Sequence, residues 1–321
     1  MNTKSFVRAL AITGVMVAFA GCSGTATTEP TSASGEPAPS GSPAPAPTME
    51  PTAVPSPAQP TPSPRSPLAN DWPFVRTSCP EASGQPWLVV ALGTSETAGW
   101  GIRSDEPYSP QEAYPAQYAD ILCEELGVPI ELHSYFPSQL GNELAPLAWW
   151  NERVAADAAM RADLAAAKVV VLWAMASHDI IPALALGACS GDWPDPLKTC
   201  FEAATGREPA EMDALFSAIS ELVPDGAKVL AADAYLPPAV FASWGTKPYW
   251  QELRKLIDPR ALVMPLALKH GFTFVDTEAA MNGPSLEMPL EGLFQSDGLH
   301  PTAAGALATA QVLAKADGLG D

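Results

Sequence analysis

Apolar residues recur along the chain in two alternating patterns, and each pattern predicts a different kind of element. Short runs that are apolar throughout, or that alternate with polar residues, predict strands. We expect five strands, at residues 86–93, 129–136, 168–175, 227–237 and 271–277. Longer segments with apolar residues three and four positions apart predict helices. These segments lie at 109–127, 142–167 (room for one or two helices), 209–224, 247–270 and 301–316.

Two prolines and a glycine help to place the helix ends. Pro115 is expected in the first turn of the helix at 109–127, which Gly127 closes. Pro301 is expected at the first helical position of the last helix. Proline suits both places because the N–H that it lacks would have no intrahelical partner there.

Strands that alternate with helices predict a parallel sheet covered by helices on both faces, which is an α/β fold with three layers. In such sheets the site lies outside the carboxyl ends of the strands. Polar or small residues lie at or just after the ends of several predicted strands: Gly93-Thr94-Ser95 after the first, residues 138–142 after the second, Ser177-His178-Asp179 after the third, and Asp276 at the end of the fifth. We therefore look for the chemistry at this edge of the sheet.

The first 22 residues differ from the rest of the chain. Lys4 and Arg8 precede an apolar run, 9–20, that is too short for an ordinary membrane-spanning helix, and small residues follow it. This pattern is typical of a secretory signal. Its end, Phe19-Ala20-Gly21-Cys22, resembles a bacterial lipobox, in which cleavage precedes the cysteine and the cysteine is lipidated. The alternative is an ordinary signal peptide with a chance cysteine.

The signal, 1–21, is followed by a segment of a different composition. Residues 22–70 are rich in Pro, Ser, Ala and Thr and carry very few charges. Such a segment buries too little apolar surface to offset the cost of ordering it, so we expect a disordered tether. The remaining residues, 71–321, have a length that suits one domain. Together these features predict an extracytoplasmic protein anchored to the membrane through Cys22.

The chain has five cysteines, and an odd number in an exported chain leaves one that cannot pair with the others and needs another role. Lipidation of Cys22 accounts for it, and an exported compartment favours disulfides among the other four. Cys189 and Cys200 enclose a short polar loop, so we pair them, which leaves Cys79 to pair with Cys123. A metal site is the competing interpretation of these cysteines, but no CxxC spacing occurs.

The net charge of the chain is −19, which argues against a nucleic-acid partner. The candidate chemistry is that of a serine nucleophile, which needs a base to take its proton and a third group to orient that base. Ser95 is the candidate nucleophile, because it lies in a turn of small residues after the first predicted strand. His300 is the candidate base, and Asp297 orients it from three residues away. The backbone N–H groups of Ser95 and Gly141 are the candidate oxyanion donors.

With these residues in place, the chain resembles the SGNH or GDSL-type serine hydrolases, a family of esterases and lipases, over roughly residues 86–316. Four blocks in the family's order carry the resemblance: Gly93-Thr94-Ser95, Gly141, Ala176-Ser177-His178-Asp179 and Asp297-Gly298-Leu299-His300. The resemblance implies a flavodoxin-like α/β/α sandwich. It also implies ester hydrolysis through an acyl-enzyme, with no cofactor and no metal.

Two positions depart from the family's pattern. Thr94 stands where the family has an aspartate that is mainly a structural hydrogen-bonding residue, and a hydroxyl can serve there. His178 stands where the family has an asparagine whose amide donates to the oxyanion. A neutral histidine also has one N–H, so we expect His178 to be the third oxyanion donor. The alternative is that His178 makes a structural hydrogen bond within its loop.

We therefore expect a monomeric, membrane-tethered esterase that acts on an ester substrate, with small acyl groups on carbohydrate favoured and Trp100 lining the pocket. Hydrolysis of lipid esters, acyl transfer to a sugar, and a binding domain that has lost catalysis are the alternatives. A metal site could be drawn from His178, Asp179, Asp297 and His300, but it would leave Ser95 without a role. We expect structural roles for the remaining His and Asp residues near the strands, which are His133, His270, Asp179 and Asp276.

Overall fold

The structure is a computed structural model of the chain, and it describes residues 75–77, 79–103, 105, 108–137, 146–173, 189–285 and 289–319. Within these ranges the chain forms one six-stranded sheet. The strands are β1 (Val75–Thr77), β2 (Trp87–Leu92), β3 (Ile130–Tyr135), β4 (Val169–Trp173), β5 (Lys228–Ala232) and β6 (Thr273–Val275). They lie in the order β1-β3-β2-β4-β5-β6.

Five of the strands are parallel, and β1 pairs antiparallel with β3 at the edge of the sheet. If β2 is counted as the first parallel strand, their order is 2-1-3-4-5, which is the flavodoxin-like order. At least one helix separates each parallel strand from the next along the chain, as the alternation of strand and helix patterns predicts. The predicted α/β fold is therefore confirmed.

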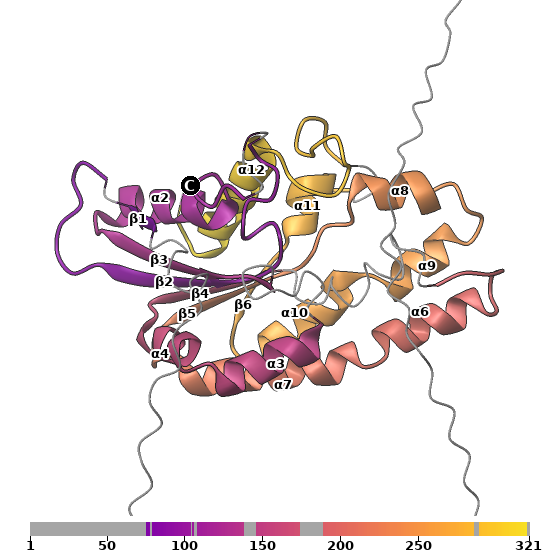
Figure 1. Ribbon diagram of the computed structural model, residues 1–321, viewed down its shortest axis with the longest axis horizontal. Coiled ribbons are helices and arrows are strands. Elements are labelled where there is room, and N and C mark those ends of the chain that lie inside the picture. The colour runs from indigo at the N-terminus through magenta and orange to yellow at the C-terminus, as the bar shows by residue number, and fades with distance from the viewer. Residues whose placement is uncertain are drawn as a thin grey trace, which may run out of the picture. The chain divides into compact units, whose positions relative to one another are not determined.

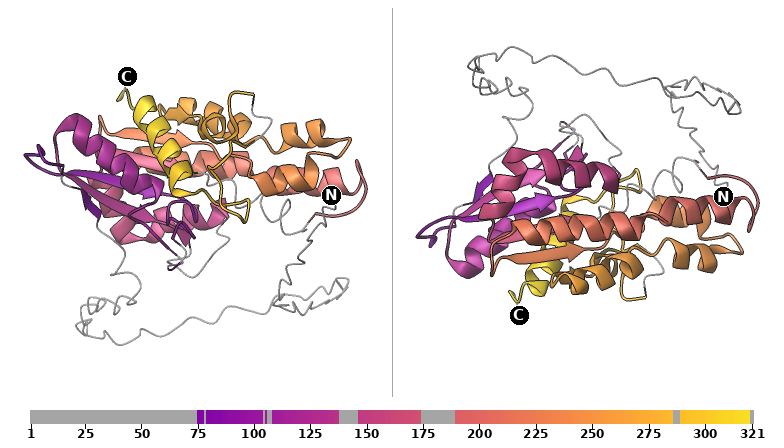
Figure 2. Two further views of the ribbon diagram at one scale, coloured as in Figure 1. Left: turned by 90° about the horizontal axis from the view of Figure 1, so that it is seen from above. Right: turned by 90° about the horizontal axis from the view of Figure 1, so that it is seen from below.

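Helices cover both faces of the sheet (Figure 1). On one face lie α2 (Tyr114–Leu126), α11 (Thr277–Asn282) and α12 (Ala303–Ala316). On the other face lie α3 (Leu147–Ala156), α4 (Ala158–Ala166), α7 (Glu208–Leu222) and α10 (Pro259–Lys269). Figure 2 shows α2 and α12 from above and α3 and α7 from below.

Alternate residues of each strand face the two helical layers. In β2, Val89 and Ala91 pack with α2 and α12, whereas Val90 and Leu92 pack with α3 and α7. All four are fully buried. A strand buried on both faces has a continuous apolar sequence, which is why the short apolar runs predict where the strands lie.

Several element ends differ from the sequence prediction. The strand expected at 227–237 ends at Ala232. Ala234 and Leu236 are buried although they lie outside the strand, so the apolar pattern continues past the strand's end. Pro301 does not begin the last helix. It forms an isolated bridge with Phe294, and Thr302 caps α12 by accepting a hydrogen bond from the backbone N–H of Gly305.

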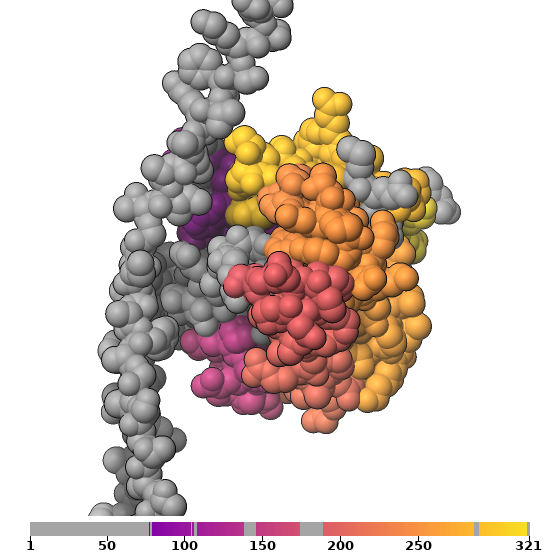
Figure 3. Space-filling view, turned by 90° about the vertical axis from the view of Figure 1, so that its right-hand side faces the viewer, coloured from indigo at the N-terminus to yellow at the C-terminus, as the bar shows by residue number. Residues whose placement is uncertain are grey.

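A third apolar cluster lies beside the sheet, around α6 (Leu197–Thr205), α8 (Pro238–Trp244) and α9 (Trp250–Leu256). Figure 3 shows this face of the molecule, with α6 in red and α8 and α9 in orange. Of these helices the sequence pattern predicts only the region of α9. The backbone N–H of Ala239, in α8, donates to the carbonyl oxygen of Gly298, so this cluster contacts the loop before α12.

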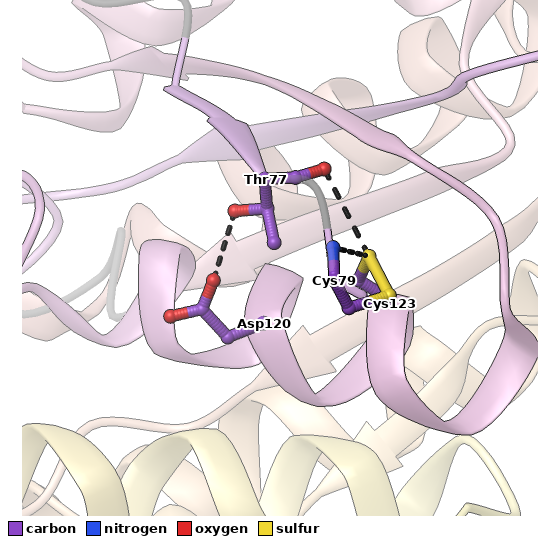
Figure 4. Close-up of a disulfide and its surroundings, with 4 residues drawn as sticks. All are labelled: Thr77, Cys79, Asp120 and Cys123. Carbon is purple, nitrogen blue, oxygen red and sulfur yellow. Dashed lines mark hydrogen bonds between the residues drawn. A yellow bond between two sulfur atoms is a disulfide. The ribbon is translucent and has the colours of Figure 1, made fainter. Parts of the chain in front are cut away.

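Both expected disulfides are present in the structure, Cys79–Cys123 and Cys189–Cys200. The first joins the segment after β1 to α2 (Figure 4), where Cys123 is fully buried. The hydroxyl of Thr77 donates to the carboxylate of Asp120 beside it, at 2.9 Å. The second disulfide closes the loop that leads into α6. Among the described residues, no helix combines the length and the apolar character needed to cross a bilayer.

Candidate active site

The candidate nucleophile, Ser95, lies in a tight turn directly after β2. The carbonyl oxygen of Thr94 accepts from the N–H of Thr97, and that of Ser95 accepts from Ala98 and Trp100. Gly93 begins this turn because no side chain fits there. A Cβ on Gly93 would lie 2.1 Å from the hydroxyl oxygen of Thr97 and 3.1 Å from the Cβ of Trp173. The small residues after the strand thus bend the chain sharply and present the Ser95 hydroxyl at the sheet edge.

The structure brings Ser95, His300 and Asp297 together. Nε2 of His300 lies 3.0 Å from Oγ of Ser95, and Nδ1 of His300 lies 2.7 Å from Oδ2 of Asp297. The imidazole is mostly covered, with 18% of the His300 side chain exposed, and Asp297 is more open at 39%. A hydroxyl, an imidazole and a carboxylate therefore lie in a row at hydrogen-bonding distances.

The carboxylate of Asp297 is held by more than the histidine. Its Oδ1 atom accepts hydrogen bonds from the backbone N–H groups of Leu299, at 2.8 Å, and of His300, at 3.1 Å. Burial alone would raise the pKa of Asp297. The hydrogen bonds from the His300 ring and from these two N–H groups outweigh burial, so that the pKa is lowered below its usual value. Asp297 is therefore an anion at neutral pH, as a partner for an imidazolium must be.

Gln295 connects the loop that carries Asp297 and His300 to the turn at residues 93–100, which we call the nucleophile turn. The amide nitrogen of Gln295 donates to the carbonyl oxygens of Trp100, at 2.8 Å, and Pro301, at 2.7 Å. The backbone N–H of Gln295 donates to the carbonyl oxygen of His300. These bonds connect two segments that are far apart in the sequence, and they set the distance between Ser95 and His300.

Trp100 lies beside the imidazole. Its ring centroid is 5.9 Å from that of His300, and it meets the ring of Tyr108 edge-on at 5.1 Å. Trp100 is half-buried, so one wall of the space beside His300 is aromatic. This position agrees with the expectation that Trp100 lines a substrate pocket, although the role itself stays a prediction.

Two residues of the site were not predicted from the sequence. They are Glu96 and Tyr235. The carboxylate of Glu96 accepts hydrogen bonds from the hydroxyls of Thr94, Ser95 and Tyr235. The hydroxyl of Tyr235 also donates to the carbonyl oxygen of Leu299, in the loop that carries Asp297 and His300, which we call the base loop. The only signal in the sequence is an acidic residue directly after the candidate nucleophile. Tyr235 follows β5 and gives no signal that separates it from a core aromatic residue.

Two expected oxyanion donors, Gly141 and His178, lie outside the described residues, as does Asp179. Their roles stay predictions. The other histidines pair with acids away from the candidate site: Nδ1 of His133 lies 2.6 Å from Asp163, and Nε2 of His270 lies 2.7 Å from Asp213. Asp276 caps α11 and forms an ion pair with Arg260. Within the described ranges, no three His, Cys, Asp or Glu side chains are grouped as a metal site would require.

The family model for GDSL-like lipases and acylhydrolases matches residues 91–308, a span that begins in β2 and ends in α12. It therefore includes every residue of the candidate site. No curated protein matches the chain.

Solved structures with a similar fold include a lipase, an esterase and a hydrolase, all of low sequence identity. A lipase from a goat rumen metagenome is 17% identical, with a TM-score of 0.53 over 72% of this chain and 97% of that chain. A variant of an acetyl xylan esterase from Geobacillus stearothermophilus is 15% identical, with a TM-score of 0.51 over 74% and 97%. An α/β hydrolase from the metagenome of Lake Arreo, Spain, is 17% identical, with a TM-score of 0.50 over 74% and 96%. These similarities support the fold.

Proposed function

Because this chain belongs to the GDSL-like lipase/acylhydrolase family, and is therefore an ester-hydrolysing enzyme, we propose that it cleaves carboxylic esters through an acyl-enzyme on Ser95. His300 acts as the base, and Asp297 orients and balances it. The observation that carries the proposal is the row of contacts from Ser95 Oγ to His300 Nε2, at 3.0 Å, and from His300 Nδ1 to Asp297, at 2.7 Å. Such a row is the arrangement that activates a serine.

The reaction follows from these contacts. As Oγ of Ser95 attacks the ester carbonyl carbon, its proton passes to Nε2 of His300, and Asp297 stabilises the imidazolium that forms. The tetrahedral intermediate then collapses, the ester C–O bond breaks, and the imidazolium gives its proton to the leaving alcohol. Water attacks the acyl-enzyme with His300 as base, and the acid leaves as Ser95 regains its proton.

The oxyanion of each tetrahedral intermediate needs donors. We assign them to the backbone N–H groups of Ser95 and Gly141 and to the side-chain N–H of His178. Each such donor is worth about a hundredfold to a thousandfold in kcat in other enzymes. The position of Ser95 in a tight turn supports this assignment for its own N–H.

For the substrate, we favour short acyl groups on carbohydrate. The half-buried ring of Trp100 beside His300 supports this choice, because an indole can stack on the apolar face of a sugar. The similar fold of an acetyl xylan esterase adds to it. Lipid esters are the alternative, and a series of acyl chain lengths distinguishes the two.

We also propose that the enzyme works outside the cytoplasm, tethered through a lipid on Cys22. The secretory pattern of the first 22 residues supports this proposal, and the two disulfides fit an oxidising compartment. Metabolic labelling with a fatty-acid analogue tests it. Incorporation into the wild-type chain, and none into a Cys22→Ala variant, is the expected result.

The test of the esterase uses the full chain with p-nitrophenyl acetate, butyrate and longer esters. We expect turnover that falls with chain length, labelling of Ser95 by a fluorophosphonate, and loss of both in Ser95→Ala. Absence of turnover on every ester together with absence of labelling would refute the proposed mechanism. Turnover that rises with chain length would instead favour lipid esters.

A further inference from the structure

Glu96, the residue directly after the candidate nucleophile, is in contact with three hydroxyl groups. Its Oε2 atom accepts from the hydroxyl of Thr94, and Oγ of Ser95 lies 3.2 Å from the same oxygen. Its Oε1 atom lies 3.2 Å from the hydroxyl of Tyr235. Thr94 is 1% exposed and Tyr235 is 6% exposed, so this carboxylate satisfies hydroxyl groups that have little or no access to water.

Tyr235 connects this carboxylate to the loop that holds the base. Its hydroxyl lies 3.1 Å from the carbonyl oxygen of Leu299, the residue before His300. Burial, together with the charge of Glu96, raises the pKa of Tyr235 well above its usual value. The phenol therefore keeps its single proton and shares it between the Glu96 carboxylate and the Leu299 carbonyl.

The two contacts together form a continuous connection. It runs from Thr94 through Glu96 and Tyr235 to Leu299, and so from the nucleophile turn to the residue that precedes the base. Gln295 makes a separate connection between the same two segments through Trp100 and Pro301. Two separate hydrogen-bonded connections thus join the segment that carries Ser95 to the segment that carries His300.

We propose that Glu96 is a positioning residue of this active site: through Tyr235, it holds the turn that carries Ser95 against the loop that carries His300, and so keeps Oγ of Ser95 within reach of the imidazole. The inference rests on the proposed serine esterase function. Glu96 takes no proton in the reaction. The single proton of the Ser95 hydroxyl leaves toward Nε2 of His300, which lies 3.0 Å from Oγ.

The network can be satisfied by a neutral side chain of the same shape, and this allows hydrogen bonding to be separated from charge. In Glu96→Gln, the amide oxygen can accept from Thr94, and the amide nitrogen can donate to Tyr235, whose proton then goes to Leu299. Glu96→Asp keeps the charge but is shorter by one methylene group. Glu96→Leu removes both the charge and the hydrogen bonds.

The experiment measures hydrolysis of p-nitrophenyl acetate by the full chain, and the rate at which a fluorophosphonate labels Ser95. We expect Glu96→Leu and Glu96→Asp to lower kcat and the labelling rate by about tenfold to a hundredfold, because small misplacements of reacting groups cost that much. KM should change by less than about threefold, and Glu96→Gln should stay within about threefold of the wild-type kcat. Glu221→Leu, a change at an exposed position at the end of α7, is the matched control.

A second variant tests the connection through Tyr235. Tyr235→Phe should lower kcat, and the double variant with Glu96→Leu should be no slower than Glu96→Leu alone, because both changes break one connection. If Glu96→Leu does not fold, as judged by circular dichroism, the two single variants Tyr235→Phe and Glu96→Gln are compared instead. Tyr235→Phe alters no charge and should still lower kcat, whereas Glu96→Gln should stay near the wild-type value.

Several results would overturn the inference while the esterase proposal stands. A wild-type kcat and labelling rate in Glu96→Leu would show that Glu96 does not position the site. Equal losses in Glu96→Gln and Glu96→Leu would show that the charge, and not the hydrogen bonding, matters. If the losses in kcat from Glu96→Leu and Tyr235→Phe were fully additive in the double variant, the two residues would not act through one connection. A wild-type chain with neither turnover nor labelling would instead refute the esterase mechanism and this inference with it.

Discussion

Nε2 of His300 lies 3.0 Å from Oγ of Ser95, although 205 positions separate the two residues in the sequence. One lies near the start of the folded part of the chain and the other near its end. Ser95 follows β2, the second strand of the described chain, and His300 precedes α12, its last helix. The sheet places both at the carboxyl edge of its strands, where parallel α/β folds bind their ligands.

The contact between Asp297 and His300 leads to a first prediction. In Asp297→Asn the amide oxygen can still accept from the N–H groups of Leu299 and His300, so the loop should keep its shape. The carboxylate that balances the imidazolium is lost, and kcat should fall by about a thousandfold to ten-thousandfold. The measurement is kcat with p-nitrophenyl acetate, beside Asp105→Asn as an exposed control. A kcat within about threefold of wild type would contradict the role given to Asp297.

The tight approach at Gly93 leads to a second prediction. In Gly93→Ala the new Cβ would meet Thr97 and Trp173, so we expect a loss of about 1–3 kcal/mol in the free energy of unfolding. Because the same shift moves Ser95, kcat should also fall by at least about tenfold. Urea unfolding and ester hydrolysis measure the two effects.

Gly226→Ala is the control for this change. Gly226 has a φ of 83° with nothing within 4 Å of a Cβ, so it tests backbone strain without a clash. It should cost about 1–2 kcal/mol and leave kcat unchanged. If Gly93→Ala behaved in the same way, the close contact at the nucleophile turn would have no catalytic consequence.

The two disulfides should differ in their contribution to stability. Cys79–Cys123 spans 44 positions and Cys189–Cys200 spans 11. The loss of unfolded-chain entropy grows with loop length and predicts about 4 kcal/mol for the longer loop and about 3 kcal/mol for the shorter one. Urea unfolding of the two double-alanine variants measures both values. An equal or reversed order would show that the loop lengths do not govern the difference.

A buried acid outside the candidate site predicts how stability depends on pH. Asp233 is fully buried, and burial raises its pKa to about 7, against opposing hydrogen bonds from Thr277 and from the backbone N–H of Glu278. Its Oδ2 atom has no partner within the described part of the chain. In the unfolded chain the pKa is about 3.9. Between these values the folded state holds a proton that the unfolded state has released.

The free energy of unfolding should therefore fall as pH rises from about 4 to about 7, by up to about 1.4 kcal/mol per pH unit from this group. Asp233→Asn should flatten the slope, because the amide does not titrate. Urea unfolding at a series of pH values measures it, with the exposed Asp225→Asn as the control. The slope is the readout, since the amide N–H group placed at Oδ2 changes the absolute stability as well. A slope unchanged by Asp233→Asn would contradict the prediction.

The order of strands and helices could be predicted from the sequence because it depends on burial. Strands that are covered on both faces, such as β2 and β4, read as unbroken apolar runs. The ends were less predictable for the same reason. Residues that follow β5 stay buried outside the sheet, and Pro301 pairs with Phe294 instead of starting α12.

The sequence by itself determined the α/β class and the candidates Ser95, Asp297 and His300, since apolar periodicity and a local Asp-x-x-His spacing are properties of short segments. Only the tertiary structure decided what surrounds the nucleophile. One partner of Glu96 is the hydroxyl of Tyr235, 139 positions away, and the Leu299 carbonyl accepts from that same hydroxyl. Contacts of this kind arise when the sheet brings the ends of β2 and β5 to one edge beside the loop before α12, and no local pattern of residues encodes them.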